Sequence, residues 1–139
     1  MFKTILLPVD MTDRHQQALD TAVEFAAQSG GAITLLHVIE TITGLSLEEG
    51  KDFYQRLESV ALNHLDKWGK DLKKRKIPWQ REVRYGNRAA ESVRYALETA
   101  ADLIVLTSPR FEPANPGAGW GSMSYKISIL SQCPVLLVK

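Results

Sequence analysis

Residues 3–40, KTILLPVDMTDRHQQALDTAVEFAAQSGGAITLLHVIE, contain the pattern that decides the fold. The stretch begins with a short apolar run that ends at Asp10, as is typical of a buried strand. Thr12 or Asp13 is expected to cap a following helix, which Gly30 ends. AITLLHVIE (32–40) is then a second apolar strand. A strand, a helix and a second strand in this order predict a parallel pair joined by a right-handed crossover.

The rest of the chain repeats this alternation. A long helix is expected at 47–74, with Leu57 and Val60 among its apolar residues. WQREVRY (79–85) alternates and predicts a half-exposed strand at a sheet edge. A helix carrying Leu97, the strand DLIVLTS (102–108), a short helix from Ser122 and the strand PVLLV (134–138) complete the pattern. We therefore expect an α/β fold, in which one domain of residues 1–139 forms a doubly wound, mostly parallel sheet with helices on both faces.

Composition narrows the function classes. The net charge of +1 over 139 residues argues against a nucleic-acid binder. A basic run at 70–76 is interpreted as the solvated end of a helix, with a polyanion patch as the alternative. The single cysteine, Cys133, predicts a reducing compartment, and no apolar run approaches the length of a membrane span. A strand beginning near Phe2 leaves no room for a signal peptide, so we expect a cytoplasmic protein without a membrane partner.

In open α/β sheets, ligands bind beyond the carboxyl ends of the strands, where the strand order reverses. Residues 8–12 and 107–110 follow the two strands that would flank such a point. Asp10 is either a ligand for an adenine amine or ribose hydroxyl, or a residue that caps a helix or closes the strand end. Val38 and its neighbours would supply an apolar wall for a base. His37 is interpreted as a core or strand-facing residue, with a catalytic use as the alternative. His15 and His64 are interpreted as packing or surface residues, and no metal site is expected.

The segment 113–124, PANPGAGWGSMS, places glycines at alternate positions before a short helix. Glycines let backbone N–H groups approach an anion, and the helix N-terminus adds further donors. Ser122 either caps that helix or donates its hydroxyl to a phosphate oxygen. The segment matches neither the P-loop nor G-x-G-x-x-G. Phosphate binding and a plain turn both remain open on these residues.

Several motifs together resemble the universal stress protein family across essentially the whole chain. They are the P-x-D ending of the first strand, LLHV in the second, ADLIVL in the fourth, and Gly-Ser followed by Cys-Pro-Val. The resemblance implies a five-stranded parallel sheet of order 3-2-1-4-5, similar to the adenine nucleotide alpha hydrolase-like fold. It also implies a homodimer paired through the last strand: Pro134, Val135, Leu136, Leu137 and Val138. An apolar edge strand needs such a cover, although the long loop folding over it is an alternative.

Members of this family that bind ATP resemble the pattern G-x-x-G, nine residues, then G-[ST]. Gly121 and Ser122 match its end, whereas Thr107 and Arg110 stand where the first two glycines belong, and the spacing is one residue too long. A side chain at those positions intrudes where backbone meets ligand, although Arg110 could instead neutralise phosphates. The nucleotide site implied by the resemblance comprises Pro8, Val9, Asp10, Val38, Thr107, Ser108, Arg110, Gly119, Gly121, Ser122 and Met123, with Mg²⁺ only as a counter-ion of the nucleotide.

Two functions follow from this resemblance. The first is a dimeric stress-response protein that binds ATP or another adenine nucleotide at the strand ends. The second is a stress protein without nucleotide that acts as a dimeric interaction module, which Thr107 and Arg110 favour. No catalytic set of side chains is recognisable in the sequence, so we do not expect an enzyme; slow ATP hydrolysis would need a base that the sequence does not identify.

Overall fold

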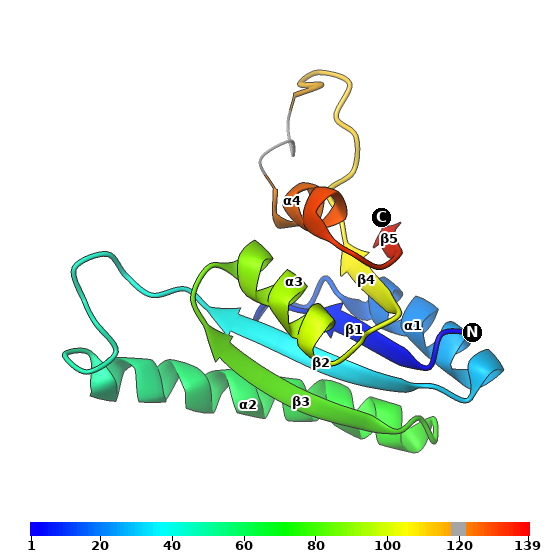
Figure 1. Ribbon diagram of the computed structural model, residues 1–139, viewed down its shortest axis with the longest axis horizontal. Helices are drawn as coiled ribbons and strands as arrows, with labels where there is room; N and C mark the ends of the chain where they lie inside the picture. Colours follow the sequence, from blue (N-terminus) through cyan, green and yellow to red (C-terminus); the bar gives the residue numbers. More distant parts are fainter. Residues whose placement is uncertain (118–121) are drawn as a thin grey trace.

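The computed structural model describes residues 1–117 and 122–139 and contains one five-stranded sheet of order β3-β2-β1-β4-β5. Every neighbouring pair of strands is parallel, as the alternating sequence pattern predicted. Figure 1 shows the strands in this order, from β3 at one edge to β5 beside the C-terminus. The strands are β1 (Thr4–Pro8), β2 (Ala32–Ile39), β3 (Trp79–Tyr85), β4 (Leu103–Thr107) and β5 (Val135–Val138).

Four helices in the described ranges cover the two faces of the sheet. They are α1 (Gln16–Ser29), α2 (Lys51–Lys74), α3 (Arg88–Glu98) and α4 (Met123–Leu130). Ile5 and Leu7 of β1 pack in one core cluster with residues of α1 and α2. Leu6, between them, belongs to a second cluster with residues of α3 and α4. Because successive side chains of a strand point to opposite faces, a strand covered on both sides needs the continuous apolar run that β1 has.

Two helices begin later than the sequence predicted. Neither Thr12 nor Asp13 caps α1, because the Asp10 carboxylate accepts the backbone N–H of Thr12 at 2.9 Å and holds the chain in a turn. The N-cap position of α1 is instead His15, whose side chain makes no capping hydrogen bond. Helix α2 begins at Lys51 after Gly50, rather than at 47. The predicted apolar face was also too wide, since Val60 is 58% exposed and Leu57 37%.

Strand β3 lies at one edge of the sheet, and its residues are half-buried or exposed, as the sequence predicted. On the other edge, β5 pairs with β4 alone.

Leu97, which the sequence placed on the apolar face of its helix, is 58% exposed near the end of α3. Among the described residues, no helix combines the length and apolar character that crossing a membrane requires.

Candidate functional site

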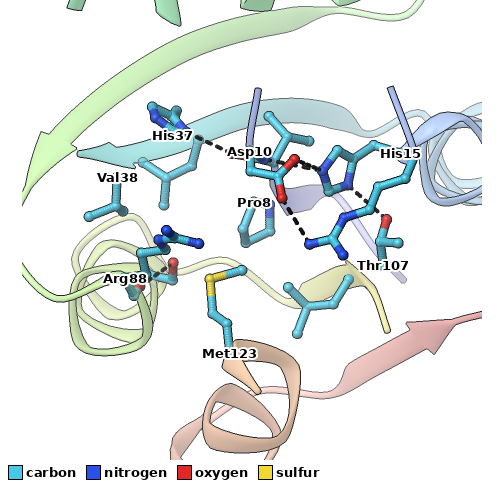
Figure 2. Close-up of a pocket in the computed structure, with 13 residues that line it drawn as sticks. Pro8, Asp10, His15, His37, Val38, Arg88, Thr107 and Met123 are labelled. Carbon is cyan, nitrogen blue, oxygen red and sulfur yellow. Dashed lines mark hydrogen bonds and ion pairs between the residues drawn. The ribbon is translucent and has the colours of Figure 1, made fainter. Parts of the chain in front are cut away.

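A pocket of about 130 Å³ lies at the carboxyl ends of β1, β2 and β4, beneath α3 and α4. This is the place where the strand order reverses between β1 and β4, and where ligands bind in open α/β sheets. Figure 2 shows the labelled side chains from these elements around one common space. The pocket is lined by Pro8, Val9, Asp10, Arg14, His15, Leu36, His37, Val38, Arg88, Ser92, Leu106, Thr107 and Met123.

Asp10 follows β1 and is the most heavily bonded carboxylate at the pocket. Its Oδ1 accepts from the backbone N–H and the hydroxyl of Thr12, and its Oδ2 accepts from Arg14 at 2.8 Å. Burial alone would raise the pKa of Asp10, but the hydrogen bonds from Thr12 and His15 outweigh burial and hold that pKa well below its usual range. Asp10 is therefore an anion with a fixed orientation, and it both closes the strand end and faces the pocket.

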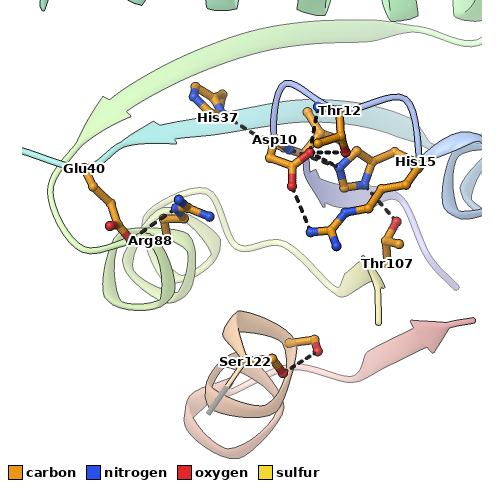
Figure 3. A network of polar contacts seen from close by, with 11 residues as sticks. Asp10, Thr12, His15, His37, Glu40, Arg88, Thr107 and Ser122 are labelled. Carbon is orange, nitrogen blue, oxygen red and sulfur yellow. Dashed lines mark hydrogen bonds and ion pairs between the residues drawn. The ribbon is translucent and has the colours of Figure 1, made fainter. Parts of the chain in front are cut away.

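His15 joins the ends of β1 and β4, a role that the sequence interpretation missed. Its Nε2 lies 2.8 Å from Asp10 Oδ1, and its Nδ1 lies 2.8 Å from Thr107 Oγ1. The residue is only 3% exposed, so of the two interpretations from sequence, packing or surface, packing is confirmed. Figure 3 shows the chain of contacts from Asp10 through His15 to Thr107. A polar residue five positions after Asp10, in the turn before α1, was the only sequence signal for this contact.

The protonation of His15 follows from its two partners. Burial lowers the pKa of His15 below its ordinary value, although the neighbouring Asp10 carboxylate partly offsets that effect. The ring is therefore neutral near pH 7. Nε2 faces two groups of Asp10: the backbone N–H donates to it at 3.1 Å, and the carboxylate oxygen Oδ1 lies 2.8 Å away and would accept a proton from it. Nδ1 shares a hydrogen bond with the hydroxyl of Thr107, and which of the two donates depends on the nitrogen that carries the ring proton.

The apolar wall predicted at the end of β2 is present. Val38 is buried and lines the pocket beside Leu36. The neighbouring His37 donates from Nδ1 to the carbonyl of Val9 at 2.9 Å, and this bond ties β2 to β1. Burial lowers the pKa of His37, so this ring too is neutral near pH 7. With Pro8 and Met123, these side chains form a surface on which a flat ring can pack.

Arg88 at the start of α3 is a second pocket residue that the sequence interpretation missed. Its Nε donates to Glu40 Oε1 at 3.1 Å, and Figure 2 shows its guanidinium in the same space as Val38, Pro8 and Met123. The neighbouring Asn87 caps α3 by accepting the backbone N–H of Ala90 at 2.9 Å. A cation thus stands at the mouth of the pocket, with half of its side chain exposed.

The predicted site residues after β4 do not all reach this pocket. Of the described part of the chain, Thr107 and Met123 line it, whereas Ser108, Arg110 and Ser122 do not. Ser108 is buried and its Oγ accepts from Lys139 Nζ at 3.0 Å, while Arg110 is exposed. Ser122 caps α4, and its Oγ accepts the backbone N–H of Tyr125 at 3.2 Å. Gly119 and Gly121 lie outside the described residues.

The outer edge of β5 forms a second surface of interest. Leu137 is 38% exposed there, and Val135 and Val138 are half-buried. Ile129 and Leu130 at the end of α4 are 62% and 52% exposed. Pro134 is exposed immediately before the strand, and its carbonyl accepts from the backbone N–H of Ile104 on β4. Within residues 1–117 and 122–139, no cluster of three or more potential metal-ligating residues occurs.

Comparison with known proteins identifies the family to which this fold and pocket belong. A family model described as the universal stress protein family matches residues 1–139. The chain belongs to the universal stress protein family. Universal stress protein G of Escherichia coli O157:H7 is 30% identical to it over 149 aligned positions that cover both chains completely.

Solved structures of universal stress proteins share the fold. The universal stress protein UspA of Lactobacillus plantarum superimposes with a TM-score of 0.79 at 22% identity, covering 99% of this chain and 98% of that one. A universal stress protein of Archaeoglobus fulgidus, solved in complex with dAMP, has a TM-score of 0.75 at 18% identity, with 99% and 98% covered. At these identities the likeness establishes the arrangement of strands and helices.

Proposed function

We propose that this universal stress protein is a homodimeric regulatory protein that binds an adenine nucleotide at the β1–β4 pocket and pairs through β5. The observation that carries the nucleotide part is a pocket that combines an apolar wall with a fixed carboxylate. Val38, Pro8 and Met123 offer the wall for a base, and Asp10 offers an acceptor for a ribose hydroxyl or an adenine amine. The dAMP bound by the Archaeoglobus fulgidus protein supports this ligand class.

The size of the pocket limits how much of a nucleotide it encloses. A cavity of about 150 Å³ holds a benzene-sized ring, and this pocket has about 130 Å³. It therefore encloses only part of an adenine ring, and the rest of the base, the sugar and the phosphate would lie in the open mouth near Asp10 and Arg88. Mg²⁺, in this proposal, enters only with a phosphate chain as its counter-ion.

The proposed dimer rests on the apolar edge of β5. A strand with unpaired backbone groups and exposed apolar side chains is normally covered in a soluble protein. The same strand of a second copy covers it through closed two-fold symmetry, and Ile129 and Leu130 extend the apolar surface. Replacing Leu137 by Glu is expected to yield monomers in sedimentation velocity, whereas Val60→Glu on the exposed side of α2 leaves the dimer intact. A wild-type protein that sediments as a monomer at high concentration would contradict this proposal.

A second candidate is a dimeric interaction module that binds no nucleotide. The contact that favours it is the bond between Thr107 and His15, because it places a β-branched side chain where nucleotide-binding members have glycine. In either case we propose a regulatory rather than a catalytic role, with which slow ATP hydrolysis would be compatible. The lone Cys133 is consistent with a reducing compartment such as the cytoplasm.

Titration calorimetry of AMP, and of ATP with Mg²⁺, into the nucleotide-free protein tests the nucleotide proposal. We expect micromolar binding of at least one ligand, and a loss of about tenfold or more in Asp10→Asn, since a charged acceptor is replaced by a neutral amide. Asp13→Asn is the matched control, because Asp13 is an exposed carboxylate three residues away that does not line the pocket. No heat with any adenine ligand at millimolar concentration would leave the interaction module as the function.

A further inference from the structure

A second cavity, of about 250 Å³, adjoins the β1–β4 pocket between the first turns of α3 and α4. Among the described residues it is lined by Glu40, Asn87, Arg88, Ala89, Met123 and Lys126. Arg88 and Met123 also line the β1–β4 pocket, so the two cavities are neighbours. Figure 2 shows Arg88 from α3 and Met123 from α4 beside the same space. A ligand larger than the first pocket can therefore extend into the second cavity.

The side chains of the second cavity are mostly hydrogen-bond donors. Arg88 Nε lies 3.1 Å from Glu40 Oε1, as Figure 3 shows, and the two terminal nitrogens of its guanidinium have no acceptor in the described ranges. The ammonium group of Lys126 likewise has no ion-pair partner in residues 1–117 and 122–139. Asn87 accepts the backbone N–H of Ala90 through Oδ1, which leaves its amide NH₂ as a further donor.

The charge of this cavity is positive, because two cations stand against the one carboxylate of Glu40 among its described residues. Glu40 does not cancel the field of Arg88: burial is the main cause that lowers the pKa of His37, and the charge of Arg88 lowers it further. A cavity needs about 10–15 Å³ to hold one water, so 250 Å³ leaves room for a group of four oxygens. Charged donors with free N–H groups, one of them a guanidinium fork, are suited to a phosphate group.

The loop after β4 is less suited to a phosphate group. Lys139 lies there, but its Nζ donates to the Ser108 hydroxyl at 3.0 Å and to the Pro109 carbonyl at 2.8 Å. Pro109 has no backbone N–H to offer. Arg110 is exposed and lines neither cavity. The ammonium on this side is thus engaged with oxygens of the chain itself, whereas that of Lys126 is available.

We propose that Arg88 and Lys126 form an oxoanion site that takes a phosphate group, either free or carried by the nucleotide in the adjoining pocket. Lys126 then determines specificity, because it favours a nucleoside monophosphate over the uncharged nucleoside. The nucleotide form of this inference rests on the proposed function, since it needs a base in the first pocket. Binding of free phosphate does not depend on the proposed function.

Calorimetry with adenosine and with AMP tests the nucleotide form. For the wild-type protein we expect AMP to bind about tenfold more tightly than adenosine, the effect of charge-assisted hydrogen bonds to one group. In Lys126→Gln this ratio is expected to fall to about threefold, and in Lys126→Gln combined with Arg88→Gln to about one. Lys70→Gln is the matched control, because Lys70 is an exposed lysine on α2 that lines neither cavity.

Thermal denaturation with inorganic phosphate, against chloride at the same ionic strength, tests the site without a nucleotide. Phosphate is excluded from protein surfaces and raises the Tm of any variant to some extent. Specific binding adds to that rise, so the wild-type protein and Lys70→Gln should gain about 2 °C more than Lys126→Gln. Circular dichroism checks that each variant is folded.

The outcomes for the two proposals are distinct. If neither adenosine nor AMP binds but phosphate raises the Tm through Lys126, the proposed nucleotide function fails and the oxoanion site stands. If AMP binds no more tightly than adenosine and Lys126→Gln responds to phosphate as the wild type does, the oxoanion site is overturned. A ratio of AMP to adenosine affinity that falls in Arg110→Gln but not in Lys126→Gln also overturns it, because the phosphate then lies at the loop after β4.

Discussion

At the scale of single residues, the buried imidazoles make folding sensitive to mild acid. His15 and His37 are both neutral in the folded protein, since burial lowers the pKa of each below its ordinary value near 6.5. In the unfolded chain each ring has its ordinary pKa. As the pH falls, the unfolded chain therefore binds a proton at each ring before the folded protein does. Their contribution to stability is present above that value and is lost as the pH falls below it.

We accordingly expect the free energy of unfolding to decrease below about pH 6.5, by up to about 1.4 kcal/mol per pH unit for each ring. Urea denaturation at a series of pH values measures this slope. His15→Gln should make the slope shallower, because the amide does not titrate, whereas His64→Gln serves as the comparison. A slope in His15→Gln equal to that of the wild type would show that His15 is not neutral in the folded state.

At the scale of the elements, close contacts between a helix and a strand set which residues are tolerated. Gly69 lies within α2, and a Cβ placed on it would be 2.1 Å from the ring of Trp79 at the start of β3. A helix would otherwise gain about 1 kcal/mol from Ala in place of Gly. The contact therefore explains why the long helix carries a glycine in its interior.

Gly69→Ala is expected to destabilise the protein by about 1–3 kcal/mol, because the overlap with Trp79 exceeds the gain in helix propensity. Thermal denaturation measures the change. Lys70→Ala, at the exposed neighbouring position, is the control and should have little effect. In a double-variant cycle, a smaller residue in place of Trp79 should reduce the cost of the Gly69→Ala substitution.

The cap of α3 is a second contact whose loss is measurable. Asn87→Ala removes the acceptor for the backbone N–H of Ala90 and is expected to cost about 1 kcal/mol. Asn63→Ala on the exposed side of α2 is the control and should be close to neutral. Because Arg88 follows the cap directly, fraying of this turn should also weaken ligand binding in calorimetry. Unchanged stability in Asn87→Ala would show that the turn does not depend on the cap.

The elements also show where prediction from sequence stops. Four of the strands follow from apolar runs and β3 from an alternating pattern. Asp10, Val38 and Thr107 follow from their position at strand ends, which a parallel sheet brings to one edge. His15 and Arg88 lie beside helix starts, where tertiary packing rather than periodicity decides the direction of a side chain. Val60 has the apolar spacing of α2 but lies outside the narrower stripe that the sheet covers.

At the scale of the whole molecule, the sheet is held together by contacts between residues far apart in the chain. The Asp102 carboxylate accepts the backbone N–H groups of Lys3 at 2.9 Å and Thr4 at 3.0 Å. These bonds fasten the beginning of β4 to the beginning of β1 across nearly a hundred residues. The central strand β1 thereby has one partner that follows it closely in sequence and one that arrives late.

Asp102→Ala is expected to lower the free energy of unfolding by about 1–3 kcal/mol, since two backbone donors lose a charged acceptor. Asp52→Ala at the exposed start of α2 is the comparison. If the β1–β4 pair forms only after the folding transition state, stopped-flow measurements should show faster unfolding with an almost unchanged folding rate. An unchanged stability would mean that water replaces the carboxylate without loss.

The late arrival of β4 has a consequence for biosynthesis. While a ribosome makes this chain, β1 and β2 are complete long before β4 emerges, and synthesis of the intervening segment takes several seconds. During that interval the β1 edge of the β1–β2 pair lacks its neighbour β4, which is a hazard for aggregation. The nascent protein is thus most in need of a chaperone in the middle of its synthesis, and the need ends when Asp102 reaches the amides of Lys3 and Thr4.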